Sequence, residues 1–299
     1  MTTLAESNTT AITADHAGSR AAGESRPVRY VVAAICIFMI VIMLMPIVFS
    51  FFASIKSPAD AHQVPPSYWP QSLSLDNYIK VFNFQAGLWT YVGNSVAVAA
   101  LAIVMCLALS IPAGYGLARF KIKAKEFWFI LLLAPLMIPY QALLTPLYLT
   151  FAKIGLANSW LGLAIVHTIL QLPFSIYLMR NSFEGIPREL EEAAKVDGAT
   201  SMQILRGVFM PLIVPGMVTV ALFAFIASWN EFLSALIFMN KETSFTVPIM
   251  LVSVRTGRLG AVDWGALQAG VMIAILPCVL IYVLLQKYYV AGFLNGAVK

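Results

Sequence analysis

Six long apolar runs, separated by polar loops, constrain this chain more than any other feature. The first, Val28 to Phe52, has about 25 residues, which at about 1.5 Å per residue is enough to cross a hydrocarbon layer about 30 Å thick. In a bilayer the backbone must satisfy its own hydrogen bonds, and the ~10-residue alternation of a closed barrel is absent, so each run is predicted to be a helix. The other five runs lie near residues 89–118, 127–151, 158–179, 208–239 and 264–286.

The composition supports an all-α integral membrane protein with six transmembrane helices. Apolar residues make up 60% of the chain and charged residues 11%, and the mean hydropathy is +0.82, which is not the profile of a water-soluble domain. Prolines inside the runs predict kinked or locally broken helices. These prolines are Pro112, Pro135, Pro139, Pro146, Pro173 and Pro277.

The N-terminal quarter of the chain divides into three parts. Residues 1–27 lack an apolar period and are predicted to be a disordered tail. The run 28–52 exceeds the ~7–15 apolar residues of a signal peptide and has no small-x-small cleavage site after it, so we expect an uncleaved span. Residues 53–88 contain four prolines and are predicted to be an aqueous loop.

The distribution of basic residues predicts the orientation. With a cytoplasmic N-terminus, six of the 19 lysines and arginines fall in outer loops and the other thirteen lie inside, so both ends are predicted to be cytoplasmic. The six outer residues are Lys56, Lys80, Lys153, Lys241, Arg255 and Arg258. The net charge of +5 therefore reflects the basic residues that mark the cytoplasmic loops. The chain has no pattern of basic and aromatic residues that would indicate nucleic-acid binding.

The most polar interior segment, residues 187–203, is predicted to be a helix, a turn and a second short helix on the cytoplasmic side. Pro187 suits a first helical position, and Gly198 suits a left-handed stop. Thr200 and Gln203 have the spacing of a capping box. Leu190, Ala193 and Ala194 share one face, which fits either a docking surface or an ordinary amphipathic helix on the membrane.

No catalytic or metal-binding pattern is present in the sequence. We find no G-x-x-x-x-G-K-[ST] phosphate loop, no His-Glu-x-x-His and no Gly-x-Ser-x-Gly, and His16, His62 and His167 are isolated. Cys36, Cys106 and Cys278 each lie in an apolar run without C-x-x-C spacing, so we expect core side chains and no disulfide or metal.

A few polar residues lie within the predicted spans. His167 and Gln171 are four apart in the fourth span, where they either line a polar path or bond to neighbouring helices. Asn230 and Glu231 lie toward the outer boundary of the fifth span. Glu231 either faces a substrate passage or lies among wet headgroups while Trp229 anchors the interface.

The segment around Glu192 resembles the EAA-x3-G-x9-I-x-L-P signature of permeases of ATP-binding-cassette (ABC) importers. Glu192-Ala193-Ala194, Gly198 and Val208-x-Met210-Pro211 match it, with Val208 and Met210 as conservative departures. Further matches resemble permeases of maltose-type (MalG-like) carbohydrate importers, although amino-acid and phosphate importers share the EAA signature. These are Leu75-Asp76-Asn77-Tyr78, Asn94-Ser95, the stretch from Tyr115 to Phe120, Trp229-Asn230-Glu231-Phe232 and the stretch from Gly292 to Lys299.

The resemblance implies a type I importer permease fold with cytoplasmic coupling helices, a permease core at 89–290 and a cytoplasmic C-terminal tail at 291–299. It implies two cytosolic ATPase subunits that bind ATP and Mg, a second permease that is a different chain, and an extracytoplasmic solute-binding protein, all in a bacterial inner membrane. No cofactor is expected in this chain. The residues implied to contact the ATPases are Glu192, Ala193, Ala194, Asp197 and Gly198, with Gly296 and Lys299 near the C-terminus.

Two other classes compete with a carbohydrate importer permease. A stand-alone ion-coupled carrier is disfavoured because acidic residues are almost absent from mid-span. A membrane enzyme lacks a catalytic constellation. Within the favoured class, a non-sugar solute is the alternative cargo.

Overall fold

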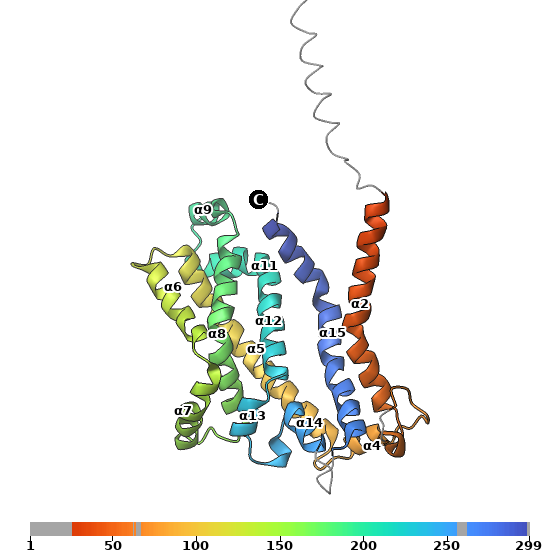
Figure 1. Cartoon of the computed structure of the whole chain (residues 1–299). Coiled ribbons are helices and arrows are strands. Elements are labelled where there is room, and N and C mark those ends of the chain that lie inside the picture. Colours follow the sequence, from red (N-terminus) through yellow and green to blue (C-terminus); the bar gives the residue numbers. More distant parts are fainter. Residues whose placement is uncertain (1–25, 62, 64–66, 256–261, 298–299) are drawn as a thin grey trace, which may run out of the picture. The chain divides into compact units, whose positions relative to one another are not determined.

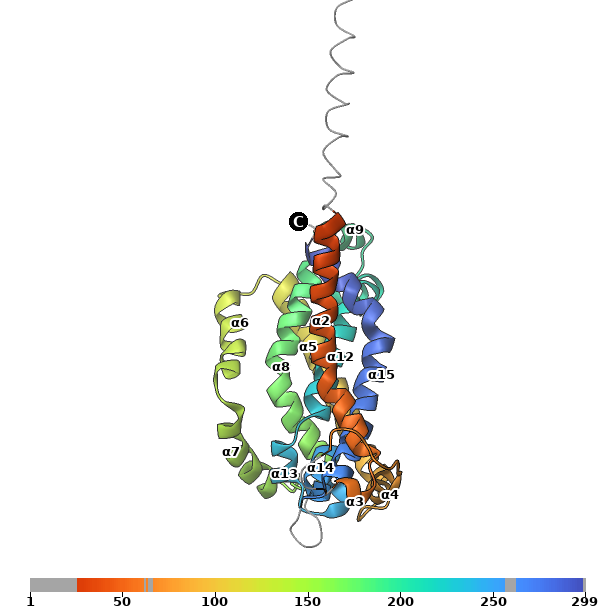
Figure 2. The same ribbon diagram turned by 45° about the vertical axis from the view of Figure 1, so that its right-hand side comes forward.

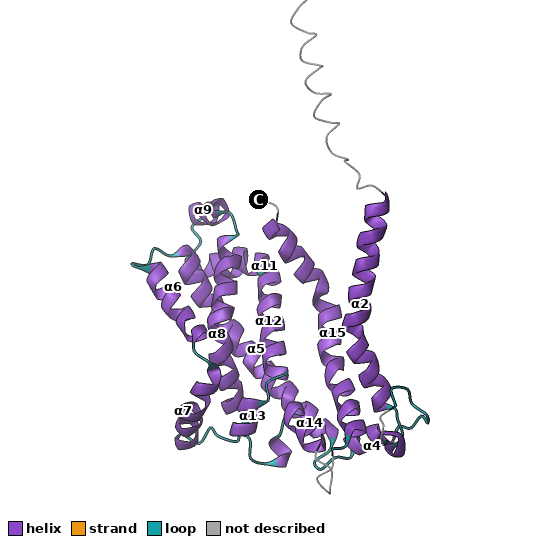
Figure 3. Ribbon diagram, in the orientation of Figure 1, coloured by secondary structure: helices purple, strands orange, loops and turns teal. Residues whose placement is uncertain are grey.

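The computed structural model describes residues 26–61, 63, 67–255 and 262–297. The described residues form helices and loops and contain no β-strand (Figure 3), which confirms the all-α prediction. The tail predicted at 1–27 lies outside this part of the chain, apart from its last two residues, which already belong to the first helix, α2 (Arg26–Ser54).

The chain divides into two compact units, Met1–Phe49 and Ser50–Lys299. In the first unit, α2 reproduces the span predicted at 28–52. From Val28 to Val48 its side chains are exposed and almost all apolar, as suits a helix that is surrounded by lipid or by other membrane helices.

In the second unit, α5 (Leu88–Arg119), α8 (Trp160–Glu184) and α12 (Val214–Trp229) form the packed centre, and α15 (Trp264–Ala297) packs against α12. α5 and α8 approach each other closely at Gly114, where a Cβ atom would lie 2.7 Å from the Met179 Cβ. Buried side chains such as Phe183 and Phe209 fill the space around these helices. α5, α8 and α15 are long and apolar enough to cross a membrane, as predicted.

The two remaining predicted spans are broken, and the break in the first of them confirms the local breaks that its prolines predict. The span predicted at 127–151 consists of α6 (Lys125–Leu133), the 3-10 turn η1 (Ala134–Met137) and α7 (Tyr140–Lys153), with a bend of 94°. The span predicted at 208–239 bends by 74° between Leu212 and Val214 and then breaks again before α13 (Leu233–Phe238). The first break lies between Pro135 and Pro139, because proline removes a helical N–H and disfavours helix in the residue before it.

The predicted outer loop 53–88 also contains helices, namely α3 (Pro58–Ala61) and α4 (Asp76–Phe82). They lie at the same end of the second unit as α7, α13 and α14 (Val247–Arg255), near the short turn η3 (Glu242–Ser244) (Figure 1). At the other end lie α9 (Arg188–Val196), α10 (Ser201–Ile204), the π-helical turn η2 (Leu205–Phe209) and α11 (Met210–Leu212). α15 ends there too, and its helix runs through most of the tail predicted at 291–299. Figure 2 shows α6 and α7 stacked as an arm beside α8.

Candidate functional site

The polar segment of the sequence forms an elbow, which we define as residues 188–204. Pro187, predicted as the first helical residue, is the N-cap of α9, so the helix begins one position later, at Arg188. Gly198 has φ of +80°, the left-handed conformation that glycine adopts without strain, which confirms the predicted stop. Thr200 and Gln203 form the predicted capping box, with the Thr200 N–H donating to Gln203 Oε1 at 2.8 Å. Local signals alone therefore fix the shape of the elbow.

The outer side of the elbow is apolar and uncovered in this chain. Leu190 is 44% exposed and Val196 is 88% exposed, and Ala193 between them is exposed as well. Glu192 and Asp197 are also on the surface. Ala194, predicted to share the face of Leu190 and Ala193, is half-buried against the chain's own core. The open surface is therefore centred on Ala193.

The inner side of the elbow is fastened to the helix bundle. Arg119, the last residue of α5, donates through Nη2 to the carbonyl oxygens of Phe183 and Ile186 at the end of α8. Its Nη1 lies 3.7 Å from Oε2 of Glu191 in α9. Tyr115 donates through its hydroxyl to the Ser201 carbonyl at 3.3 Å. The elbow is thus linked directly to the ends of α5 and α8.

The predicted contacts near the C-terminus are only partly described. Gly296 lies in the last turns of α15, at the elbow end of the second unit (Figure 1). Lys299 lies outside the described residues.

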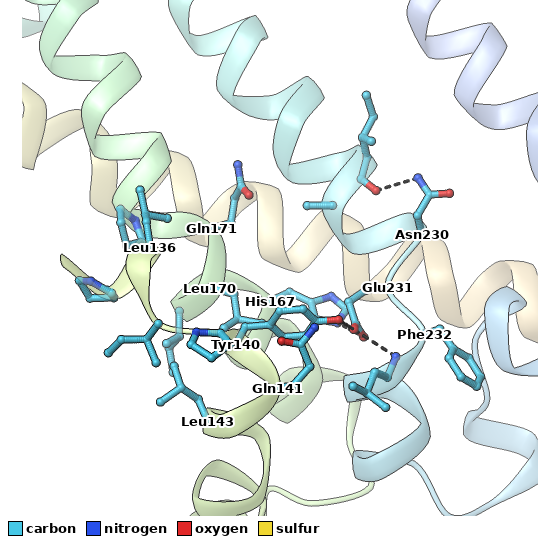
Figure 4. Close-up of a pocket in the computed structure, with 18 residues that line it drawn as sticks. Leu136, Tyr140, Gln141, Leu143, His167, Leu170, Gln171, Asn230, Glu231 and Phe232 are labelled. Carbon is cyan, nitrogen blue, oxygen red and sulfur yellow. Dashed lines mark hydrogen bonds and ion pairs between the residues drawn. The ribbon is translucent and has the colours of Figure 1, made fainter. Parts of the chain in front are cut away.

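A pocket of about 760 Å³ lies between the α6–α7 arm and the helices α8 and α12. Its wall is mostly apolar, with a small set of polar side chains, of which Tyr140, Gln141, His167 and Glu231 are grouped together in Figure 4. This combination is typical of small-molecule sites. The polar lining residues are Tyr140, Gln141, His167, Gln171, Asn230 and Glu231. The structure therefore brings together all four residues that the sequence proposed for a polar path.

His167 lines this pocket and bonds to neighbouring segments, as the second sequence reading of this residue expects, whereas a polar path along it stays a prediction. Its Nδ1 lies 2.8 Å from the Ser228 hydroxyl in α12, and its Nε2 lies 3.0 Å from the Ser234 hydroxyl in α13. The imidazole is therefore a fixed part of the wall. Gln171 lies one turn further along α8, and among the described contacts only its backbone carbonyl is bonded, to the Ser175 hydroxyl.

Glu231 is held at the break between α12 and α13. Its carboxylate accepts the backbone N–H groups of Leu233, Ser234 and Ala235 at 3.1, 2.9 and 3.2 Å. It also accepts the Ser234 hydroxyl, and the Tyr140 hydroxyl lies 3.5 Å away. The carboxylate thus accepts the backbone N–H groups of the first turn of α13, which have no partner within the helix.

The interfacial role considered for Trp229 was wrong. Its side chain is 2% exposed and its Nε1 donates to the Ala274 carbonyl in α15 at 3.1 Å, because α15 covers this face of α12. Asn230 beside it is exposed and donates to its own helix at Ile226.

Sequence reasoning missed four polar partners at this site: Tyr140, Gln141, Ser228 and Ser234. Tyr140 and Gln141 follow Pro139 directly, so a polar pair next to a proline inside an apolar run was the available signal. Within the described residues, no group of three or more His, Cys, Asp or Glu side chains could hold a metal ion.

The bundle of apolar helices has two bent spans, an internal pocket and a polar elbow that is bonded to one end. Together these features define a permease subunit of an ABC importer. The chain belongs to the family described as binding-protein-dependent transport system inner membrane component, whose model matches residues 110–293. It is accordingly a multi-pass inner membrane protein with the type I permease fold.

Several characterised relatives cover most of the chain. The sulfoquinovosyl glycerol transport system permease SmoH of Agrobacterium fabrum is 32% identical over 274 residues, which are 92% of this chain and 94% of SmoH. The arabinooligosaccharides transport system permease AraQ of Halalkalibacterium halodurans is 35% identical over 231 residues, 77% of this chain and 81% of AraQ. Both relatives are permease subunits.

Among solved structures, a chain of a bacterial ABC transporter involved in the import of the acidic polysaccharide alginate superposes with a TM-score of 0.76. It is 25% identical in sequence, and the match covers 89% of this chain and 99% of that one. Most of the chain therefore has a counterpart of known fold.

Proposed function

We propose that this chain is the permease subunit that passes a carbohydrate across the cytoplasmic membrane. A solute-binding protein delivers the carbohydrate from outside, and separate cytosolic ATPase subunits hydrolyse ATP. The observation that carries the proposal is the elbow, which presents the uncovered apolar side chains of Leu190, Ala193 and Val196 while its inner side is bonded to the bundle. Such a surface fits the groove of a soluble partner.

The names of the relatives support a carbohydrate as cargo. They include permeases for sulfoquinovosyl glycerol, arabinooligosaccharides, diacetylchitobiose and trehalose. The pocket supports it as well, because amide and hydroxyl groups such as those of Gln141, Gln171 and Tyr140 pair with sugar hydroxyls.

The residues assigned to the ATPase contact are Glu192, Ala193, Ala194, Asp197 and Gly198, with Gly296 and Lys299 as a second contact. ATP and Mg belong to the partner subunits in this scheme, and a second permease, a different chain, completes the pathway. Binding and hydrolysis of ATP move the elbow, and the bundle follows as a rigid body that opens alternately to the two sides.

The elbow and both termini are assigned to the cytosol. The excess of basic residues in the predicted cytosolic loops supports this orientation. Arg119 and Arg180 do not count as free loop charges, because their side chains are only 3% and 9% exposed and both are paired with glutamates. The predicted cytosolic loops still hold more basic residues than the outer loops when Arg119 and Arg180 are left out.

Crosslinking from Ala193 tests the proposal. In a chain whose three cysteines are replaced by serine, Ala193→Cys is labelled with a maleimide-benzophenone reagent and irradiated in native membranes. We expect an adduct with an ABC ATPase, identified by mass spectrometry. Lys153→Cys, at the opposite end of the second unit, is the control. The absence of an ATPase adduct from position 193, or an equal yield from position 153, would refute the proposal.

Purification from the same membranes, followed by a carbohydrate screen of the co-purified binding protein, tests the cargo. Binding of a carbohydrate is the expected result. A binding protein that takes only amino acids or inorganic ions would refute the carbohydrate assignment and leave the ATPase contact standing.

A further inference from the structure

Arg119 is the most highly connected side chain at the elbow. It ends α5, and its side chain is 3% exposed. Its Nη2 donates to the Ile186 carbonyl at 2.6 Å and to the Phe183 carbonyl, and its Nη1 faces Glu191 Oε2 at 3.7 Å. Its guanidinium carbon lies 4.8 Å from the centre of the Phe209 ring in η2. One side chain thus contacts α8, α9 and η2 from the end of α5.

The chemistry of these contacts favours a fixed geometry. The last carbonyls of a helix have no partners within the helix and carry the negative end of its dipole, so a cation bonded to them caps the helix. A guanidinium is planar, and its donors point in set directions, so it fixes the angle between the elements that it joins. A charge this deeply buried must also be paired, and Glu191 supplies the opposite charge.

Glu191 is the matching group on the elbow. Its side chain is 9% exposed and lies on the inner side of α9, whereas Glu192 is exposed. Lys195, one turn further on, also binds it, with Nζ 2.6 Å from Oε1, and this bond raises the pKa of Lys195. The carboxylate therefore joins the elbow's own helix to the cation of α5.

The apolar cluster beneath the elbow does not fix its orientation by itself. Phe183, Phe209 and Tyr115 pack around Arg119, with ring centres 5.4 to 5.7 Å apart. Such packing is not directional, so it holds α9 close to the bundle without fixing its rotation. Among the described residues, the polar contacts from the bundle to the elbow are the Arg119–Glu191 ion pair and the Tyr115–Ser201 hydrogen bond, and Arg119 also bonds to the carbonyls at the end of α8.

We propose that Arg119 is the positioning residue that fixes the elbow to α5 and α8, so that movement of α9 carries the ends of both helices with it. This inference rests on the proposed function, because it takes the elbow as the part that the ATPases move. It assigns the link to Glu191, next to the EAA residues, with no contact between Arg119 and the ATPase.

A spin-label experiment on the assembled importer tests the link. Labels are attached to Asn181→Cys on the exposed side of α8 and to Ala193→Cys on α9, in the cysteine-free chain. The distribution of distances between the labels is measured by pulsed electron resonance, without nucleotide and with ATP, Mg and vanadate. The variants are Arg119→Ala, Arg119→Lys and Glu191→Gln. Lys121→Ala, which removes an exposed charge two residues from Arg119, is the control.

We expect a narrow distribution that keeps its width in both nucleotide states when Arg119 is present. Arg119→Ala should broaden it at least twofold while ATP hydrolysis persists, Glu191→Gln should broaden it less, and Lys121→Ala should not. The width of the distribution in Arg119→Lys should lie between those in Arg119→Ala and in the unaltered protein, because an ammonium keeps the charge but cannot reproduce the bonds of the planar guanidinium. A native width in Arg119→Ala, or equal broadening in Lys121→Ala, would overturn the inference.

If Arg119→Ala does not assemble, the width of the distribution in Glu191→Gln decides the test. This variant leaves the bonds from Arg119 to the Phe183 and Ile186 carbonyls in place. Crosslinking in separate samples of the same variants, with Ala193→Cys as the single unlabelled cysteine, distinguishes a failure of this inference from a failure of the proposed function. An ATPase adduct together with native widths refutes the role of Arg119 alone, and the absence of an adduct refutes the proposed function.

Discussion

The Nε2 atom of His167 lies 3.7 Å from Oε2 of Glu231, where α12 ends and α13 begins. The imidazole also meets Ser228 on one side of this break and Ser234 on the other. Because His167 belongs to α8, one ring ties that helix to both halves of a broken span. The same ring lines the pocket, so the hydrogen bonds that hold the two sides of the break together also fix one wall of the pocket.

His167→Ala should destabilise the protein. It removes two side-chain hydrogen bonds and leaves the buried Ser228 hydroxyl without this partner, while Ser234 keeps its bond to Glu231. Such bonds between membrane helices contribute about 0.6 kcal/mol on average and up to about 1.7 kcal/mol, so we expect a loss of about 1–3 kcal/mol. Thermal unfolding of the detergent-solubilised protein measures this loss as a lower Tm.

Gln171→Ala is the matched control from the same helix and the same pocket. Its amide makes no side-chain hydrogen bond among the described residues, so Tm should stay near that of the unaltered protein while uptake of the cognate carbohydrate changes. Equal Tm values for the two variants would contradict the role of His167 at the break.

Substitutions at Gly198 should separate turn geometry from surface contact. A Cβ at Gly198 meets nothing within 4 Å, so Gly198→Ala should cost only the left-handed backbone energy, about 1–2 kcal/mol. Gly198→Pro cannot adopt φ of +80° and should abolish uptake and weaken ATPase co-purification while membrane insertion persists. Uptake assays and pull-down of the ATPase check both. Full transport by Gly198→Pro would contradict a coupling role for the elbow.

Glu192→Lys should give the same functional loss without altering the fold. Glu192 is exposed and makes no described side-chain bond, so reversal of its charge acts on a partner and not on the chain itself. We expect an unchanged Tm together with reduced ATPase co-purification. A reduced Tm would assign this residue to folding instead.

Two glycines in one helix test the close approach of α5 and α8. A Cβ at Gly114 would lie 2.7 Å from the Met179 Cβ and 2.9 Å from the Arg180 nitrogen, so Gly114→Ala should destabilise by about 1–3 kcal/mol through overpacking. Gly116→Ala meets nothing within 4 Å and should stabilise the helix by about 0.5–1 kcal/mol. Opposite shifts in Tm are expected, and shifts of the same sign would contradict the packing described.

The loop before α4 should keep its structure well into acid. The Asp60 carboxylate accepts the Gln71 N–H at 2.7 Å and the Ser67 hydroxyl at 2.9 Å. The bond from Gln71 is the main cause that lowers the pKa of Asp60 below its usual 3.8. A lowered pKa gives stability that is present above the unfolded value and is lost as the pH falls through the folded one. Hydrogen exchange at Gln71 should therefore stay slow down to about pH 4 and lose its protection only below the usual carboxyl range.

Asp60→Asn should speed this exchange at pH 7, because the charged acceptor is gone. Asp76→Asn is the control, since Asp76 is exposed and the Gln71 N–H donates to Asp60 and not to Asp76. If Gln71 exchanges equally in both variants, the carboxylate of Asp60 does not hold the loop.

Local signals in the sequence predicted the elbow almost to the residue. Gly198, Thr200 and Gln203 act through their own backbone and nearest neighbours, so their effect does not depend on the rest of the fold. The helical runs were predictable for a related reason, because hydrocarbon leaves the backbone no alternative.

The bends were not predictable from proline alone. Pro112, Pro173 and Pro277 lie inside helices that continue past them, whereas the chain breaks beside Pro139. Neighbouring helices and side chains decide whether the lost hydrogen bond is tolerated.

The burial of single side chains was also not predictable from the sequence. Arg119 was counted as a loop charge and Trp229 was considered as an interfacial anchor, yet both are buried, because contacts with segments far away in the sequence cover them. No periodicity within one helix reveals such contacts.

The π-helical turn at Leu205–Phe209 has a consequence for the angle at which the elbow leaves the bundle. A wide turn holds one residue more than an ordinary helical turn, and each residue of an α-helix adds about 100° of rotation. Deleting Gly207, which a Cβ would not crowd, should relax the coil to standard pitch and swing α9 around the axis of the following helix. The wide turn therefore sets the direction in which the elbow projects from the bundle, and the loss of a single residue would redirect it.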